Sequence, residues 1–197
     1  MKKEFEKRIL SSLIIIPIAL FFIIKGTVYF TFFLSIFFLA TSYEWFKMTK
    51  KIPLKLIGIL YLCLSFYSAF LLRDEAGLNF FIFVIIICIF TDIGGYIFGK
   101  TFKGPRLTKI SPNKTFSGMI GSFILSVIAA SLYSQYQNSF SLFELFVIKN
   151  NDLSYILIIL FISAISQVGD LIISFFKRLA KLKDTGKLLP GHGGLLD

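Results

Sequence analysis

The chain has 197 residues, of which 56% are hydrophobic, and it carries a formal net charge of +10 at neutral pH. Apolar runs of about twenty residues recur along it, and each is long enough to cross about 30 Å of hydrocarbon as a helix. This pattern excludes an ordinary soluble domain. Because the cations lie between the apolar runs, anionic lipid head groups explain the charge better than nucleic acid does. We therefore expect an all-α, polytopic integral membrane protein.

Residues 1–77 contain the first three apolar runs, at 10–24, 28–46 and 56–72. Each should be a helix, because lipid offers no partner to an unpaired backbone amide. The first run has no small-residue cleavage site after it and more spans follow, so we expect it to be retained, with a kink at Pro17. Cys63 and Cys88 lie inside apolar runs and are interpreted as small hydrophobic residues.

The fourth run, residues 78–99, contains an acidic residue and two glycines on one face. An aspartate at the centre of a span costs about 2.5–3.5 kcal/mol, so Asp92 is a functional candidate, with a helix–helix hydrogen bond as the alternative. Tyr96 shares this face. Gly95 and Gly99 form a Gly-x-x-x-Gly pattern, which favours close helix packing over a ligand site.

A basic loop, residues 100–117, separates this run from the fifth, at 118–136. Within it, Ser111 followed by Pro112 is typical of a helix start, with the serine as N-cap. Lys114 would then stand at a helix N-terminus, which is a natural anion site. A capped helix with a lysine on the cytoplasmic side is the alternative.

The sixth run, residues 153–176, carries polar residues at every third or fourth position. They share one face, which must point to protein or water: Ser163, Ser166, Asp170, Ser174, Lys177 and Lys181. Asp170 is thus the second intramembrane acid. A helix–helix contact or a water-accessible helix end is its alternative role.

The segment after the sixth run, residues 174–197, combines cations, carboxylates and a Gly-rich turn. Its candidates for function are Lys177, Arg178, Lys183, Asp184, the sole histidine His192, Gly193, Gly194 and Asp197. Bare glycine amides can approach a phosphate closely, although a Gly-rich loop alone equally suits a plain connection. The combination predicts a site that handles phosphate at a bilayer surface.

The loop charges predict the orientation. All but three of the 21 lysines and arginines fall on one side; the exceptions are Lys25, Arg73 and Lys149. Short basic loops stay in the cytoplasm, so both termini and the site should face the cytoplasm, in a bacterial inner membrane.

Two segments carry a family resemblance. The C-terminal motif of the phosphatidate cytidylyltransferase (CDP-diacylglycerol synthase) family is resembled by Ser174, Lys177-Arg178, Lys183-Asp184, Gly186, Pro190, His192-Gly193-Gly194 and Asp197. The segments at 91–96 and 111–116 resemble its Asp-x-Gly-Ala-Tyr and Ser-Pro-x-Lys-Thr-aromatic stretches. Ser117 stands where members often carry Glu or Gln.

The resemblance implies transfer of the cytidylyl group from CTP to phosphatidate, giving CDP-diacylglycerol and pyrophosphate. It implies Mg²⁺ bound by Asp170 and Asp197. Among the catalytic residues, Lys177, Arg178 and Lys183 would neutralise phosphates and His192 would form a hydrogen bond to one. Asp184 would either orient a lysine or bind the metal indirectly. Substrate-binding roles fall to Lys114, Ser174, Gly193, Gly194, Asp92 and Tyr96.

By this division, residues 1–77 are N-terminal membrane helices and 78–197 form the catalytic region. The expected partners are CTP, phosphatidate and membrane lipids. A homodimer is compatible with the sequence, and no nucleic-acid partner is expected. In the family, Arg-x-Asp and usually a further hydrophobic helix follow Asp197. We therefore expect that the chain is a fragment or that something else closes its site, and we do not expect full activity from these 197 residues alone.

Two other functions stay open at this point. A CTP-dependent polyprenol or phytol kinase would pass the γ-phosphate of CTP to an alcohol. A transporter would use Asp92 and Asp170 as midplane ion ligands, but the internal repeats typical of transporters do not occur in the sequence.

Overall fold

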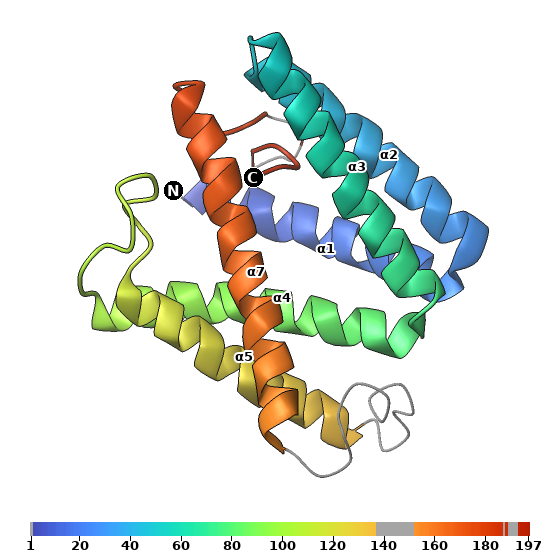
Figure 1. Ribbon diagram of the computed structural model, residues 1–197, viewed down its shortest axis with the longest axis vertical. Coiled ribbons are helices and arrows are strands. Elements are labelled where there is room, and N and C mark those ends of the chain that lie inside the picture. Colours follow the sequence, from blue (N-terminus) through green and yellow to red (C-terminus); the bar gives the residue numbers. More distant parts are fainter. Residues whose placement is uncertain (1, 137–151, 187, 189–192) are drawn as a thin grey trace. The chain divides into compact units, whose positions relative to one another are not determined.

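The structure is a computed structural model that describes residues 2–136, 152–186, 188 and 193–197. Six helices occur within these residues, in the order α1 (Lys2–Lys25), α2 (Thr27–Met48), α3 (Ile52–Asp74), α4 (Gly77–Phe102), α5 (Phe116–Tyr136) and α7 (Asp152–Leu179) (Figure 1). No strand occurs in the described residues, and an isolated β bridge pairs Arg106 with Thr115. The prediction of an all-α fold is confirmed.

Five of the helices are long and apolar enough to cross a membrane, namely α2, α3, α4, α5 and α7. In α1 the apolar part is shorter, Leu10–Lys25. The helix positions agree with the predicted spans to within several residues, because hydropathy alone determines where a chain can sit in lipid. The chain is a polytopic membrane protein; six crossings and the side of the site remain predictions.

By their contacts the residues form two compact units. One, here the N-terminal unit, comprises Met1–Leu78 with Phe176–Asp197, and the other, the central unit, comprises Asn79–Phe175. The C-terminal motif thus packs with the first helices of the chain, far from it in sequence.

In the N-terminal unit, α2 packs against both α1 and α3 (Figure 1). Aromatic side chains fill both contacts. The ring of Phe22 stacks on Phe33 with centroids 5.2 Å apart, and Phe38 meets Phe66 edge to face at 5.6 Å. At the end of α3, Arg73 Nε donates a hydrogen bond to the carbonyl of Ile23 at 2.8 Å, which satisfies an acceptor in the last turn of α1.

Trp45 joins α2 to α3 and to the end of α7. It is 1% exposed, and its Nε1 donates to the carbonyl of Leu54 at 3.1 Å. The ring lies directly over Gly58, where an added Cβ would fall 1.7 Å from the indole. Its other edge meets the ring of Phe176 at 4.8 Å. Any residue larger than glycine at position 58 would therefore displace the tryptophan that anchors the C-terminal segment.

The central unit has an apolar core and a close helix pair. Phe83, Ile87, Ala130 and Ile159 are fully buried in the core. A Cβ on Gly94 would lie 2.4 Å from the carbonyl oxygen of Gly121, so α4 and α5 touch through their backbones.

Gly95 and Gly99 lie in the same close contact between α4 and α5. A Cβ on Gly95 would lie 3.0 Å from Ser122 Oγ, and one on Gly99 would lie 3.1 Å from Thr115 Oγ1. The packing role predicted for the Gly-x-x-x-Gly pattern is confirmed, because small residues let helices approach.

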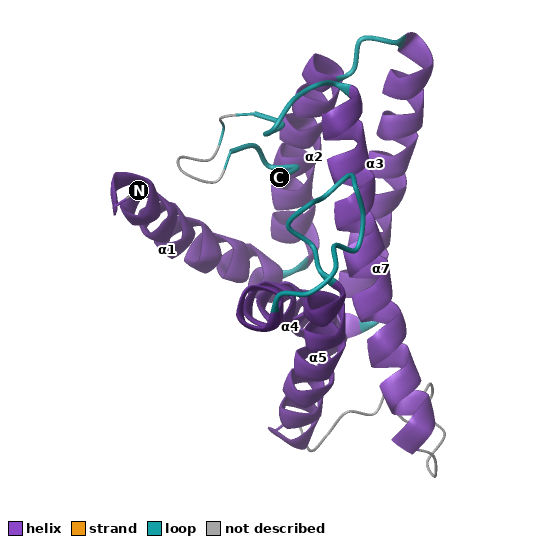
Figure 2. Cartoon of the chain, turned by 90° about the vertical axis from the view of Figure 1, so that its left-hand side faces the viewer, coloured by secondary structure: helices purple, strands orange, loops and turns teal. Residues whose placement is uncertain are grey.

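The loop between α4 and α5 is a folded hairpin, and the predicted helix start within it is wrong. Helix α5 begins at Phe116, not at Ser111 or Pro112. The loop is closed by hydrogen bonds from Leu107 N–H to the carbonyl of Lys114 at 2.8 Å and from Phe116 N–H to that of Pro105 at 3.1 Å. Figure 2 draws this connection between α4 and α5 as a loop.

The N-cap of α5 is Thr115, whose Oγ1 accepts from Gly118 N–H at 3.1 Å. Threonine is also a favoured N-cap residue, although serine is slightly more favoured. The backbone of Ser111 instead closes a turn, because its carbonyl accepts from Lys114 N–H at 3.1 Å.

Candidate functional site

The C-terminal motif begins where α7 ends and the chain reverses. Lys181 adopts φ +58°, and Leu182 N–H donates to the carbonyl of Lys177 at 2.9 Å, which closes the last turn. Arg178 Nη1 donates to the carbonyl of Leu182 at 3.4 Å. These bonds turn the following residues back toward α2 in the same unit.

Asp197 is the centre around which the motif folds. Its Oδ1 accepts from Lys177 Nζ at 2.8 Å, and its Oδ2 accepts from the N–H groups of Thr185 and Gly194, each at 2.8 Å. The side chains of Lys177 and Asp197 expose 16% and 9% of their surface.

Burial alone would raise the pKa of Asp197, but the hydrogen bonds from Lys177, Gly194 and Thr185 outweigh it and hold the pKa below its usual value. The site therefore keeps a charged carboxylate next to a lysine.

A second carboxylate in this loop was missed by the sequence analysis. Glu44, from α2, is 2% exposed and accepts hydrogen bonds from Thr185 Oγ1 at 3.0 Å, Leu195 N–H at 3.0 Å and Leu196 N–H at 3.1 Å. The signal was present in the sequence, because Glu44 lies inside the predicted second span, near its end, and acidic residues within spans are rare and usually functional.

Other motif residues have fewer described contacts. Lys183 and Asp184 are exposed, Gly194 is buried, and Gly193 has φ +104°, where a Cβ would lie 2.7 Å from Asp197 Oδ2. The predicted hydrogen-bonding role of His192 lies outside the described residues.

The central unit contains a separate cluster of charges. Lys114 Nζ donates to Asp170 Oδ2 at 2.9 Å, with side chains 30% and 51% exposed. Asp92 lies within electrostatic range of both groups. The hairpin loop presents Lys114 to α7, so two predicted substrate-binding residues and one predicted metal ligand do come together in this unit.

The remaining candidates in the central unit have local environments. Tyr96 is 67% exposed, and Lys100 Nζ reaches its hydroxyl at 3.3 Å and lies 5.4 Å from the centre of its ring. Ser174 is half-buried on α7. The polar face predicted for α7 does meet protein at Ser163, which is fully buried and accepts from Thr91 Oγ1 at 2.8 Å.

The donor set can be tested against the requirements of Mg²⁺. Among the described residues no three His, Cys, Asp or Glu side chains cluster as a metal site. Mg²⁺ with a nucleotide needs only one or two carboxylates, since phosphate oxygens and water complete its shell. Asp170 fits, because it is half exposed and only Oδ2 meets Lys114. In Asp197, Oδ2 is occupied by the loop and Oδ1 accepts from Lys177, so only Oδ1 would bind the ion, and only once Lys177 turned to a phosphate oxygen.

Comparison with known proteins places these residues in a family. The model of the Cytidylyltransferase family matches residues 49–197. A protein of Rickettsia conorii named phosphatidate cytidylyltransferase is 32% identical over 204 aligned positions, which cover 100% of this chain and 85% of the relative. No solved structure matches the chain.

Relatives from a second genus agree. A phosphatidate cytidylyltransferase of Staphylococcus saprophyticus is 38% identical over 144 positions, covering 72% of this chain and 51% of the relative. A protein of the same name from Rickettsia felis is 32% identical and covers the whole chain. The match takes in the central-unit cluster and the C-terminal motif, whereas Glu44 precedes the residues that the family model covers.

Proposed function

The chain belongs to the cytidylyltransferase family, and from this membership we propose that it transfers the cytidylyl group of CTP to phosphatidate, giving CDP-diacylglycerol and pyrophosphate. The observation that carries the proposal is the loop around Asp197. It holds a charged carboxylate beside Lys177 in a turn that also contains Lys183 and two glycines. Such a turn suits a triphosphate and its metal better than it suits an uncharged substrate.

In this reaction a phosphate oxygen of phosphatidate attacks the α-phosphorus of CTP. The new bond joins that oxygen to the α-phosphorus, and the bond between the α-phosphorus and the oxygen bridging to the β-phosphorus breaks. Pyrophosphate leaves with the bonding electrons. The nucleophile is already anionic near neutral pH, so the protein's main task is to bring two polyanions together and no strong base is needed.

The residues divide this task by charge. Lys177, Arg178 and Lys183 would neutralise phosphates from the N-terminal unit, and Lys114 would do so from the central unit. Mg²⁺, when bound with CTP, would neutralise the triphosphate and polarise its phosphoryl oxygens. Asp170 and Asp197 are the carboxylates proposed to hold the ion. Asp170 and Asp197 belong to different units. Coordination of a single ion by both aspartates is therefore a prediction.

The proposal includes an orientation. The cationic loops and the motif would face the cytoplasm, where CTP is present, and the host membrane would be a bacterial inner membrane. The asymmetry of lysine and arginine between loops supports this arrangement.

A labelled substrate distinguishes this reaction from phosphoryl transfer. Membranes containing the chain are incubated with phosphatidate and CTP labelled either in the cytidine or at the γ-phosphate. Cytidylyl transfer puts only the cytidine label into extracted lipid, whereas a CTP-dependent kinase would put only the γ-phosphate label there. Membranes without the chain are the control. A lipid product that carries the γ-label alone would contradict the proposal.

A further inference from the structure

Glu44 is a buried carboxylate whose described partners all belong to the C-terminal loop. Its three hydrogen bonds come from Thr185, Leu195 and Leu196, residues 141 to 152 positions away in the sequence. An uncharged side chain would be enough to pack a helix against a loop, whereas a buried carboxylate is costly unless it accepts hydrogen bonds. The bonds from the loop are what make this buried acid tolerable, and they fix the loop in return. The loop therefore depends on Glu44 for its shape.

The backbone of the loop also follows the surface of this carboxylate closely. A Cβ on Gly186 would lie 2.5 Å from Glu44 Oε1, and a Cβ on Gly194 would lie 2.5 Å from Glu44 Oε2. At both distances a side chain would force the Glu44 carboxylate to move away from its hydrogen-bond partners. Two glycines of the family motif are thus explained by contact with Glu44.

Thr185 connects Glu44 to the predicted reaction residues. Its hydroxyl lies 3.0 Å from Glu44 Oε2 and 3.1 Å from Asp197 Oδ2, and its N–H donates to the same Asp197 oxygen at 2.8 Å. Since Oδ2 is held in this way, Oδ1 is left to face Lys177. A shift of Glu44 would therefore rotate Asp197 and move the lysine partner with it.

We propose that Glu44 is a positioning residue for cytidylyl transfer, which acts by fixing the loop so that Asp197 Oδ1 and Lys177 point toward CTP and its metal. The inference rests on the proposed function. It assigns a role to a residue outside the part of the chain that the family model covers.

Kinetics of a Glu44 variant and two Thr185 variants, with a control at Glu75, test this role. Glu44→Gln keeps the size but replaces one acceptor by a donor, which opposes the N–H groups of the loop. We expect kcat/KM for CTP to fall by about ten- to hundredfold, the range for losing charge-assisted hydrogen bonds, while KM for phosphatidate and the thermal midpoint stay near wild type. The control Glu75→Gln makes the same change at an exposed site and should have no effect.

Thr185 provides a test that does not depend on how Glu44 variants fold. Thr185→Ser keeps the hydroxyl and should retain activity, whereas Thr185→Val should lose it to a similar extent as Glu44→Gln. Wild-type kcat/KM for CTP in Glu44→Gln, or equal activity of the serine and valine variants, would overturn the inference. A wild-type chain that forms no cytidine-labelled lipid would instead overturn the proposed function.

A different observation in the N-terminal unit carries a second inference. A cavity of about 440 Å³ lies beside the turn between α2 and α3 and the end of α7. Leu54, Phe176 and Leu179 are among its apolar lining residues. None of the described residues that line it is acidic.

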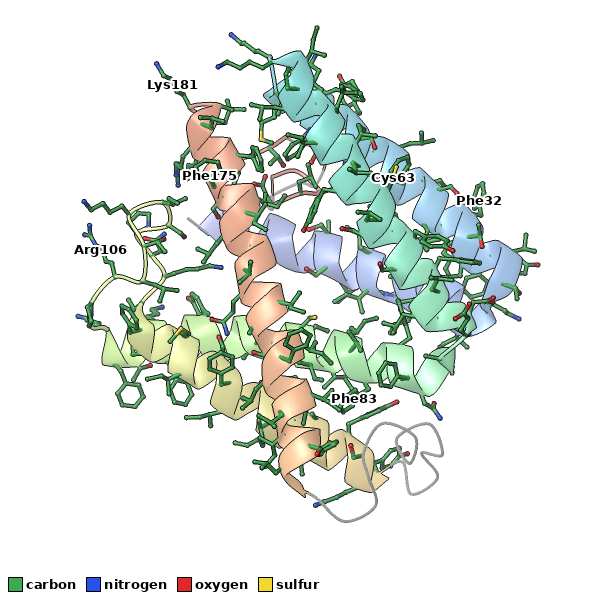
Figure 3. The ribbon with its side chains drawn as sticks, in the orientation of Figure 1. Phe32, Cys63, Phe83, Arg106, Phe175 and Lys181 are labelled. Atoms are coloured by element: carbon green, nitrogen blue, oxygen red, sulfur yellow. The ribbon has the colours of Figure 1, made fainter. Side chains whose placement is uncertain are left out.

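Three lysines complete the lining: Lys50, Lys51 and Lys181. All three are exposed, and none forms an ion pair within the described residues. Figure 3 shows Lys181 extending away from the end of α7. The cavity therefore combines uncompensated positive charge with an apolar wall, which matches a phosphate group attached to an acyl chain.

The cavity lies close to the motif within the same unit. Phe176 lines it and contacts Trp45, while the next residue, Lys177, binds Asp197. From this we infer that the cavity binds the phosphate of phosphatidate through its lysines, with the acyl chains against the apolar wall. This inference also rests on the proposed function, and it names the binding site of the lipid substrate.

Replacing the three lysines by glutamine tests the assignment. In vesicles of phosphatidylcholine, KM for phosphatidate should rise at least about tenfold, because charge-assisted contacts to the phosphate are lost, while KM for CTP stays unchanged. Lys47→Gln, outside the cavity, is the control.

A general need for anionic lipid is distinguished by adding phosphatidylglycerol to the vesicles. If the lysines bind the substrate, the added lipid leaves the defect in place. An unchanged KM for phosphatidate, or a defect that phosphatidylglycerol abolishes, would overturn the inference. An inactive wild type would again speak against the proposed function instead.

Discussion

Gly194→Ala should impair the reaction while the helices stay folded. A methyl group at this position would lie 2.1 Å from Thr185 Oγ1 and 2.5 Å from Glu44 Oε2. Forcing an extra methyl group into a packed site costs about 1–3 kcal/mol. The loop can relieve this cost by leaving Glu44, but it then also loses the hydrogen bond from Gly194 N–H to Asp197.

The magnitude follows from the population of the loop conformation. A cost of about 1–3 kcal/mol against the bound loop lowers the equilibrium ratio of bound to released loop by about fivefold to more than a hundredfold. This factor is the upper bound on the fall in kcat/KM for CTP, which we expect to be clearly measurable. The helices do not depend on the loop, so the thermal midpoint measured in detergent should change little.

The assay is formation of cytidine-labelled lipid at several CTP concentrations, alongside thermal unfolding. Gly77→Ala is the control, since nothing lies within 4 Å of its Cβ, although its φ of +86° adds local strain. That variant should keep its activity despite a small loss of stability. Normal turnover in Gly194→Ala would refute the reasoning that Glu44 and Thr185 hold this part of the loop.

Four further outcomes are expected. A cysteine at Lys103, in a chain whose native cysteines have been replaced, should react with an impermeant reagent only from the cytoplasmic side, and labelling from outside would reverse the topology. Asp170→Asn should abolish turnover with normal insertion, and an unchanged Mg²⁺ dependence would remove Asp170 from the metal site. Gly94→Ala should lower the thermal midpoint, because a Cβ there would lie 2.4 Å from the carbonyl of Gly121; an unchanged midpoint would contradict that contact. The pKa of Asp197 is lower in the folded protein than in the unfolded chain. The ionised carboxylate therefore stabilises the folded loop fully above the ordinary carboxyl pKa, and this stabilisation is lost as the pH falls through the lowered pKa of the folded state. Hydrogen exchange of the Thr185 and Gly194 amides, which donate to Asp197, should accelerate only in that acidic range after correction for the intrinsic rate. Acceleration already at neutral pH would be inconsistent with the lowered pKa.

The apolar runs determined most of what the sequence could predict. Helix positions followed from hydropathy, and the packing of Gly95 and Gly99 followed from their spacing. The face of α7 that contains Ser163 also met protein as expected, because polar groups in a span avoid lipid. These features depend on local sequence, and they could therefore be predicted from it.

The features that were missed depend on contacts distant in sequence or on competing local choices. Glu44 meets its loop partners only after the chain has folded back over more than a hundred residues, so no local pattern indicates the pairing. At the start of α5, Ser111 and Thr115 are both good caps, and the hairpin hydrogen bonds decide in favour of the threonine. Lys114 consequently reaches Asp170 from a loop and not from a helix N-terminus.

The most direct test of the central claim follows the oxygen atoms of the lipid substrate. Phosphatidate with ¹⁸O in its phosphate is incubated with the chain, CTP and Mg²⁺, and the products are analysed by mass spectrometry. If a phosphatidate oxygen attacks the α-phosphorus of CTP, all of the ¹⁸O remains in CDP-diacylglycerol and the pyrophosphate contains none. Appearance of ¹⁸O in pyrophosphate, or a phosphorylated lipid without cytidine, would contradict cytidylyl transfer.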